Sequence, residues 1–184
     1  KLDIGADLNL TATVFVQARS FYRTDGPEAL RPIGETEFAA SVAENADRIG
    51  GTKFCAAIVG YAELALGDRV RPILEAHIAA GRNRFRGIRH ILAWDRDDRL
   101  LNPGYPTSED LMDRLEFRAG FSHLSALGLS LDAWVFFHQI PRLTALARQF
   151  PDVQIVLNHC GGVLGIGGYT DCRDDVFKHW RAAM

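Results

Sequence analysis

The sequence predicts an α/β fold built around a parallel sheet. Segments with the composition of strands and of helices alternate five times along the 184 residues, and this alternation is typical of parallel strands joined by right-handed crossovers. The connections are unequal. Helix-to-strand loops are short, whereas the strand-to-helix loops 19–34, 94–107 and 161–171 are long. Long loops at the carboxyl ends of parallel strands mark the functional face of a (β/α) barrel or a doubly wound sheet.

Strands are predicted where β-branched and aromatic residues cluster between glycine, proline and polar residues. These segments are residues 13–18, 53–61, 85–92, 129–137 and 153–157. A complete eight-stranded barrel needs about 250 residues, so five strands in this chain predict a partial (β/α)8 TIM barrel. We expect one incomplete domain that covers residues 1–184.

Helices are predicted between the strands, where apolar residues recur every three to four positions. They cover residues 35–49, 69–80, 108–124 and 141–150, and a last helix begins at Asp174. The expected inner face of the first helix consists of Phe38, Val42, Ala46 and Ile49. Ser108 is expected to cap the third helix. The last turn of a further helix is expected at Leu2, Ile4 and Leu8.

Composition limits the classes of function. The chain is 47% hydrophobic and 24% charged, with a net charge of −2; this balance is ordinary for a globular protein and gives no electrostatic reason to expect nucleic acid or a membrane as a partner. We expect no signal peptide. Three cysteines without a CxxC pair favour a reducing compartment. We therefore expect a cytoplasmic protein with a small-molecule substrate; its oligomeric state is not predicted.

His159 is the first candidate site residue. It follows the apolar run 153–157 and precedes a pair of glycines. By the two-residue period of a strand, His159 points to the same side as Ile155 and Leu157. It lies at the carboxyl end of its strand, where chemistry takes place in parallel α/β folds. A lone histidine is more often a buried core residue, but here other polar side chains fall at strand ends on the same face.

Those other strand ends supply the candidates for substrate binding, namely Gln17, Arg89, His90, His138 and Gln139. Arg89 and His90 are neighbours, so only one of them can face a substrate. The planar fork of Arg89 fits a carboxylate or a carbonyl oxygen. The alternative is a structural ion pair with one of the loop aspartates Asp95, Asp97 and Asp98.

Two further positions have a structural alternative. The pair His138-Gln139 either binds substrate hydroxyls or caps the helix that follows. Asp132 lies in the middle of a strand, and a buried carboxylate needs partners. We therefore expect it to be a structural group, with Arg86 as a candidate partner.

One ordered set of segments carries a family resemblance. The segments are Phe85-Arg86-Gly87-Ile88-Arg89-His90, Leu131-Asp132-Ala133-Trp134, His138-Gln139-Ile140-Pro141-Arg142-Leu143 and Ile155-Val156-Leu157-Asn158-His159-Cys160-Gly161-Gly162, together with Asp25-Gly26-Pro27-Glu28 and Gly34-Glu35-Thr36-Glu37. Over nearly the whole chain they resemble the amidohydrolase-related family of TIM-barrel metal-dependent hydrolases, in particular its sugar-lactonase and pyrone-dicarboxylate-lactonase branch.

The resemblance implies a hydrolase that opens a cyclic ester, a sugar lactone or a carboxylated lactone, with activated water at the C-terminal face of the barrel. For His159 it implies a catalytic role, as a ligand of one divalent metal ion such as zinc or, in metal-free lactonases, as a group that polarises the carbonyl. The family's His-x-His on the first strand has no counterpart here. The aspartate that ends the last strand and acts as base is expected beyond Met184.

The resemblance thus implies that the first strand and the last two are missing, and we expect this chain alone to be inactive. Some pyrone lactonases carry an arginine three residues after the histidine, where this chain has Gly162. Two alternatives to the lactonase are an amidohydrolase-type decarboxylase, which is a lyase, of an aromatic acid and a non-catalytic barrel fragment.

Overall fold

The computed structural model describes residues 10–184, so the helical turn expected at Leu2, Ile4 and Leu8 lies outside the described residues. Within this range the chain forms two compact units. Unit 1 comprises residues 10–62 and 72–88, and unit 2 comprises residues 63–71 and 89–184. The prediction of one domain for residues 1–184 stays a prediction.

Strands and helices alternate as predicted. The strands are β1 (Ala12–Val16), β2 (Lys53–Gly60), β3 (Phe85–Ile91), β4 (Ser130–Trp134) and β5 (Ile155–Leu157). The helices are α1 (Ile33–Ile49), α2 (Arg71–Ala80), α3 (Leu115–Ala126), α4 (Ile140–Gln149), the irregular α5 (His159–Gly162) and α6 (Arg173–Ala183). The sheet has the order β1-β2-β3-β4-β5. This α/β fold with parallel strands confirms the predicted partial barrel class.

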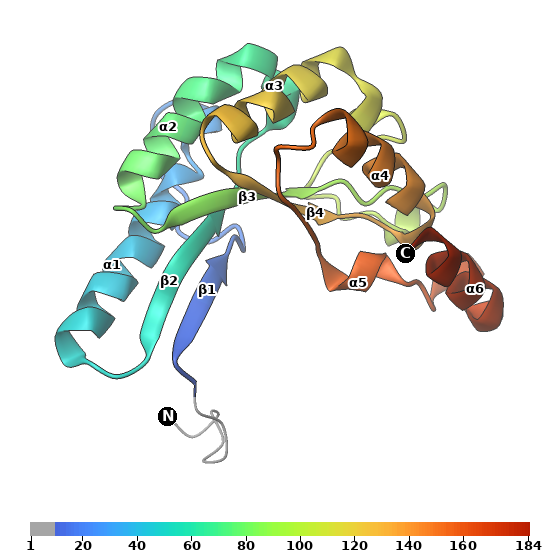
Figure 1. The fold of residues 1–184 in the computed structure, drawn as a ribbon, viewed down its shortest axis with the longest axis horizontal. Helices are drawn as coiled ribbons and strands as arrows, with labels where there is room; N and C mark the ends of the chain where they lie inside the picture. The colour runs from blue at the N-terminus through green and yellow to red at the C-terminus, as the bar shows by residue number, and fades with distance from the viewer. Residues whose placement is uncertain (1–9) are drawn as a thin grey trace. The chain divides into compact units, whose positions relative to one another are not determined.

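Unit 1 contains β1, β2 and the first half of β3, which pair in parallel. Helices α1 and α2 cover the same face of these strands (Figure 1). The buried stripe of α1 differs from the expected one, because Ala39, Ala40 and Ala43 are fully buried whereas Ile49 is exposed. Alanines allow a helix to approach a sheet closely, so beyond its first turn this helix buries mainly small residues.

His77 on α2 forms the polar centre of unit 1. Its Nδ1 lies 2.8 Å from the Thr36 hydroxyl, and its Nε2 lies 3.0 Å from the Tyr61 carbonyl oxygen. A carbonyl only accepts, so Nε2 carries the proton and Nδ1 accepts from Thr36. Burial lowers the pKa of His77 to about 4, although the bond to Tyr61 acts in the opposite direction. His77 is therefore a neutral core residue.

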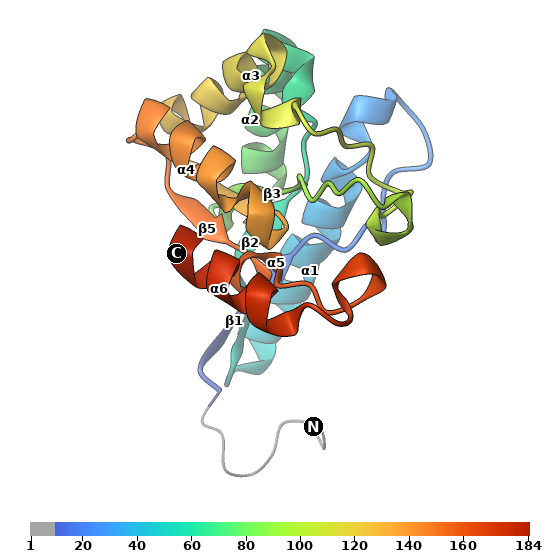
Figure 2. The same cartoon turned by 90° about the vertical axis from the view of Figure 1, so that its right-hand side faces the viewer.

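Unit 2 contains the end of β3 and the parallel pair β4–β5, in which Leu131, Asp132 and Ala133 lie opposite Ile155, Val156 and Leu157. Helix α3 packs on the 3-10 segment Leu64–Val70. Helices α4 and α6 lie side by side (Figure 2). Loops and short helical turns follow the carboxyl ends of β3, β4 and β5.

The third helix begins later than predicted. Ser108 forms a hydrogen bond to Asp110, and Asp110 forms an ion pair with Arg114, but the helix starts only at Leu115. Before it, Leu111 and Met112 are buried in a separate 3-10 turn. An extended residue between the two turns lets both of them bury their apolar side chains, and this long-range packing overrides the local capping pattern.

Among residues 10–184, no helix is both long and apolar enough to cross a membrane.

Unfolding should depend on pH through His77. Its folded pKa of about 4 lies below the value of 6.5 expected in the unfolded chain. The contribution of neutral His77 to the free energy of unfolding is therefore fully present above pH 6.5. This contribution, roughly 3 kcal/mol, is lost as the pH falls towards 4. Urea titrations between pH 4 and 7 should show this loss. It should be much smaller in His77→Gln, whereas the exposed control His179→Gln should behave like the parent; equal pH dependence in all three would contradict the argument.

A methyl group at Gly120 should disrupt unit 2. A Cβ at this position of α3 would lie 2.1 Å from the Leu64 carbonyl oxygen, so helix and backbone would have to separate. We expect Gly120→Ala to lower the free energy of unfolding by about 2 to 3 kcal/mol despite the better helix propensity of alanine. The matched control is Gly165→Ala, since no atom lies within 4 Å of its added methyl group. Thermal unfolding of both variants measures the difference.

Candidate functional site

Arg89 and His90 point to opposite sides of β3. His90 is buried on the side of the helices, where its Nε2 lies 3.2 Å from a Glu63 carboxylate oxygen and its ring meets the edge of Phe117. Arg89 lies on the other side, and its positive charge acts on Asp132 of β4. Of the two neighbours, Arg89 is therefore the one that faces the same side as Asp132.

Asp132 and Asn158 connect β4 with the end of β5. The side-chain amide of Asn158 donates to Asp132 Oδ2 over 3.2 Å. Burial raises the pKa of Asp132, and the Asn158 bond and the Arg89 charge partly offset this effect. The expected buried carboxylate is thus present, but its partners are Asn158 and Arg89, whereas Arg86 donates to the Phe85 carbonyl oxygen. Arg86 and Arg89 have opposite parity on the strand and so point to opposite sides; Arg86 as a partner of Asp132 stays a prediction.

His159 reaches this side by a turn of the backbone. Strand parity would place it with Ile155 and Leu157, which lie opposite the buried Leu131 and Ala133. The strand ends at Leu157, however, and His159 has a φ of +50°. Its ring lies edge-on to that of Trp134, with centroids 4.8 Å apart. The side of His159 expected from parity is therefore wrong, because the left-handed conformation reverses the direction of the side chain.

Gly162 leaves no room for a side chain. Its φ is +59°, and a Cβ there would lie 2.2 Å from the Val135 carbonyl oxygen. An arginine at this position would require the backbone to move. Position 162, where some pyrone lactonases have an arginine, is therefore a glycine here, and Arg89 supplies the guanidinium on this face.

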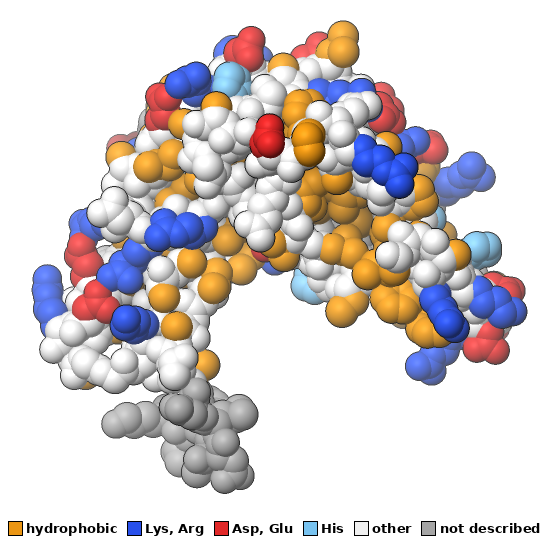
Figure 3. Space-filling model, in the orientation of Figure 1, with side chains coloured by type: hydrophobic (Ala, Val, Ile, Leu, Met, Phe, Trp, Pro, Cys, Tyr) orange, Lys and Arg blue, Asp and Glu red, His pale blue; other side chains and the backbone are white. Residues whose placement is uncertain are grey.

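A cavity of about 460 Å³, lined mainly by apolar side chains, lies beside Trp134, the residue whose ring contacts His159. Ile91 and Trp134 form its floor, since each follows Arg89 or Asp132 by two residues on the same side of its strand. The loops after β3 and β5 form its walls. In Figure 3, hydrophobic side chains gather over α5 and the strand that leads into it, whereas charged side chains lie on α6.

Gln139 has a structural position. Its Oε1 accepts from the backbone N–H groups of Trp94 and Phe136, and its Nε2 donates to the Leu92 carbonyl oxygen, each over 3.0 Å. The side chain is buried and joins the ends of β3 and β4. We therefore do not include Gln139 among the groups that contact substrate.

His138 is partly exposed and faces a second hollow, which it shares with Pro141 and His179. Its Nε2 donates to Asp95 Oδ2 over 3.0 Å, and the Tyr169 hydroxyl donates to the same oxygen over 2.7 Å. Burial acts to raise the pKa of Asp95, but these bonds and the Asp97 N–H hold it below its ordinary value. Burial and the bond to Asp95 raise the pKa of Tyr169 to about 12. His138 is thus not brought to the cavity at Trp134.

Gln17 belongs to unit 1, where it is fully buried and its backbone N–H donates to the Val59 carbonyl oxygen. Its predicted role in substrate binding stays a prediction.

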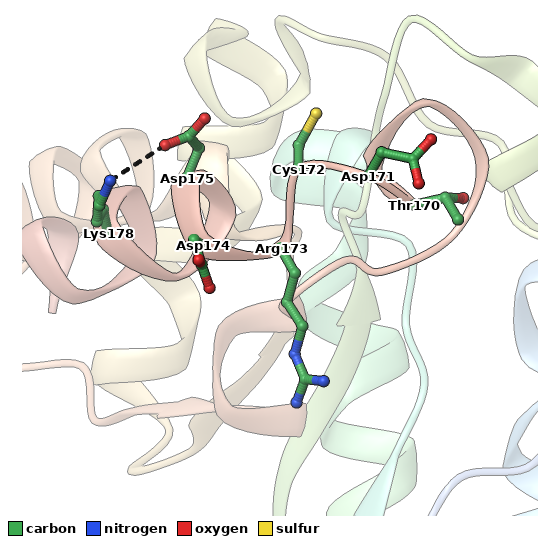
Figure 4. A pocket seen from close by; sticks show the side chains of 7 residues that line it. All are labelled: Thr170, Asp171, Cys172, Arg173, Asp174, Asp175 and Lys178. Carbon is green, nitrogen blue, oxygen red and sulfur yellow. Dashed lines mark hydrogen bonds and ion pairs between the residues drawn. The ribbon is translucent and has the colours of Figure 1, made fainter.

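A third hollow, at the start of α6, has polar walls. Figure 4 shows that Arg173 and Asp174 point away from Cys172, while Asp175 forms an ion pair with Lys178. These side chains diverge, so they do not form a site for one ligand.

Three residues of the candidate site were not assigned to it from the sequence, namely Asp132, Trp134 and Asn158. Asp132 and Trp134 share the parity of one strand, and this pattern could have placed both on one side. The contact between Asn158 and Asp132 could not be found in this way, because it depends on the register between β4 and β5.

The chain is similar to known hydrolases. The family model described as Amidohydrolase matches residues 15–184. The chain is 35% identical over 159 residues to the uncharacterized protein y4mH of Sinorhizobium fredii, covering 86% of this chain and 47% of that protein. It is 29% identical over 152 residues to L-fucono-1,5-lactonase of Burkholderia ambifaria, covering 76% and 48%. The chain spans about half the length of the curated relatives it matches.

Two crystal structures of an amidohydrolase from Burkholderia multivorans have a similar fold. The structure with bound HEPES has a TM-score of 0.54 at 22% identity and covers 95% of this chain and 63% of its own. The structure with bound zinc has a TM-score of 0.56 at 27% identity and covers 81% and 44%. The family match over residues 15–184 establishes that the chain belongs to the amidohydrolase family.

Proposed function

We propose that the protein is a hydrolase that opens a cyclic ester, with the carboxyl ends of β3, β4 and β5 as the reaction site. Family membership supports hydrolysis, and the similarity to a lactonase supports a lactone as substrate. The proposal rests on the position of Arg89, Asp132 and His159 on one side of the strands, with Trp134 both in contact with His159 and in the lining of a cavity.

Arg89 is proposed to bind a carboxylate or the carbonyl oxygen of the substrate. Its planar fork offers two parallel N–H donors to such oxygens. Asp132 and Asn158 hold this part of the site together, since the bond between them joins β4 to the end of β5. Gly162 cannot carry the alternative arginine without a backbone shift, which leaves the role to Arg89.

His159 is proposed to polarise the carbonyl of the ester. A donor placed at the carbonyl oxygen stabilises the negative charge that develops there when water adds. The acyl C–O bond then breaks, the ring oxygen takes up a proton, and the product is a hydroxy acid. The base that removes the proton of the water is not assigned to a residue of this chain.

The family resemblance implies a divalent metal ion, and one similar structure contains bound zinc. Among residues 10–184, no three His, Cys, Asp or Glu side chains come together to hold a metal ion. His159 as a single ligand does not make such a site, because catalytic zinc uses three protein ligands. We therefore derive no step through a metal ion, and His159 as a metal ligand stays a prediction.

The other expectations stay proposals. We expect a small-molecule substrate, no nucleic acid and no membrane partner. All three cysteines are free, which agrees with the proposed cytoplasmic location. His90 is not included in the substrate site, since its ring is buried against Glu63 and Phe117.

Removal of the His159 side chain should abolish most of the turnover. We expect His159→Ala to lower kcat for lactone opening by about 10²-fold or more, the typical loss of one oxyanion donor, when both proteins are assayed as full-length chains. His179→Ala, which removes an exposed histidine from α6, is the matched control. Unchanged turnover in His159→Ala would remove this residue from the mechanism. Release of CO₂ without lactone opening would instead identify a lyase.

Loss of the guanidinium fork at Arg89 should weaken substrate binding. Arg89→Lys keeps the charge but loses one of two parallel hydrogen bonds, so we expect KM to rise about tenfold with a smaller change in kcat. Arg86→Lys makes the same change on the same strand, where Arg86 donates to the Phe85 carbonyl oxygen, and should leave KM as it is. An equal KM for both variants would exclude Arg89 as a substrate ligand.

A further inference from the structure

The cavity beside Trp134 is lined mainly by apolar side chains. Its side chains are apolar with the exception of Asn102, and they are Ile91, Ala93, Leu100, Leu101, Pro103, Trp134, Phe136, Leu164 and Ile166. Asn102 already uses its side-chain oxygen to accept from the Gly104 N–H over 2.9 Å. Among the lining side chains, a sugar hydroxyl would find only the amide of Asn102 as a polar partner, whereas an alkyl group would contact apolar side chains.

The cavity is built by two loops that are fixed to each other. The Tyr169 hydroxyl, from the loop after β5, donates to Asp95 in the loop after β3. Gly167, which is also in the loop after β5, lies close to the loop after β3. A Cβ added to it would lie 3.1 Å from Asp97 Oδ2 and 3.3 Å from Leu100 Cδ2. The carboxylate of Asp97 in turn accepts from the N–H of Arg99 at the start of the turn that contains Leu100. The apolar walls are therefore positioned by polar bonds outside the cavity.

Trp134 connects the cavity with the candidate reaction site. This residue lines the cavity, and its ring lies against that of His159. Ile91, on the floor, follows Arg89 by two residues and points to the same side. A substrate whose ester group lies at Arg89 and His159 would therefore extend any further substituent towards apolar walls. The volume of about 460 Å³ lies in the range of small-molecule sites.

We infer that the substrate carries an apolar substituent, an alkyl chain or a hydrocarbon ring, and that the cavity beside Trp134 binds it. The inference rests on the proposed opening of a cyclic ester. It makes the preferred substrate a hydrophobic lactone, in contrast to the polyhydroxylated sugar lactone named for the Burkholderia ambifaria relative.

The test is a series of δ-lactones with increasing side chains, from δ-valerolactone to δ-decalactone, assayed with the full-length protein beside a sugar 1,5-lactone. We expect kcat/KM to rise about three- to fourfold for each added CH₂ until the cavity is filled, because each buried CH₂ contributes about 0.8 kcal/mol. The sugar lactone should be opened no faster than δ-valerolactone. A preference for the sugar lactone, with no rise along the alkyl series, would overturn the inference and leave the proposed function intact.

A charge in the cavity should remove the dependence on chain length. Ile166 and Val163 lie in the same loop and are 63% and 45% exposed, but only Ile166 lines the cavity. Ile166→Asp should flatten the series, whereas Val163→Asp should keep its slope. Both side chains lie outside the buried core, so both variants should fold.

Binding separates a failure of the inference from a failure of the proposed function. If no lactone is opened, the proposed function fails, and tryptophan fluorescence titrations with δ-decalactone and δ-valerolactone still test the cavity. Tighter binding of δ-decalactone, lost in Ile166→Asp, would support the apolar site. Equal binding of the two lactones would overturn it.

Discussion

The side chain of Gln139 connects the elements on which the candidate site depends. The last backbone bond between β3 and β4 runs from the Leu92 N–H to the Trp134 carbonyl oxygen over 2.8 Å. Beyond it the strands diverge, and the amide of Gln139 supplies three hydrogen bonds to backbone groups that the sheet no longer satisfies. Buried backbone groups without partners are costly, so this amide sets where the loops after β3 and β4 begin. Both loops reach the cavity from there.

The carboxylate of Asp95 has a related role at the outer edge of the site. It accepts from His138, Tyr169 and the Asp97 N–H, and these donors come from three different connections. The low pKa of Asp95 keeps it charged at neutral pH, and a charged acceptor strengthens each bond. The polar network thus rigidifies the loops without entering the cavity, which explains how long, polar loops can present apolar walls.

The candidate site combines two chemical environments. Arg89, Asp132 and Asn158 form a polar group at the strands, whereas Trp134 and the loop residues form an apolar one. An ester requires both, since its carbonyl needs donors and its substituents need walls that match their polarity. In the proposed function, the polar group acts on the ester and the cavity walls select its substituent.

The alternation of strands and helices could be predicted from the sequence because it depends on local properties. β-branched runs, helical periodicity and glycine ends depend on neighbouring residues, and all five strands are present close to their expected positions. The later start of α3 at Leu115 and the alanine face of α1 could not be predicted in this way, because distant packing partners decided both.

By itself, the sequence determined the fold class, the candidate strand ends and the family. Only the tertiary structure decided which side chains share a site. Arg89 was separated from His90 by strand parity, which the sequence contains, but the choice between the two sides depended on where Glu63 and Phe117 pack. His159 turned to the opposite side because its backbone is left-handed, at the start of a left-handed run that continues to Gly162. Asp132 met Asn158 through the β4–β5 register. Such contacts join positions far apart in the chain, and a local pattern carries no information about them.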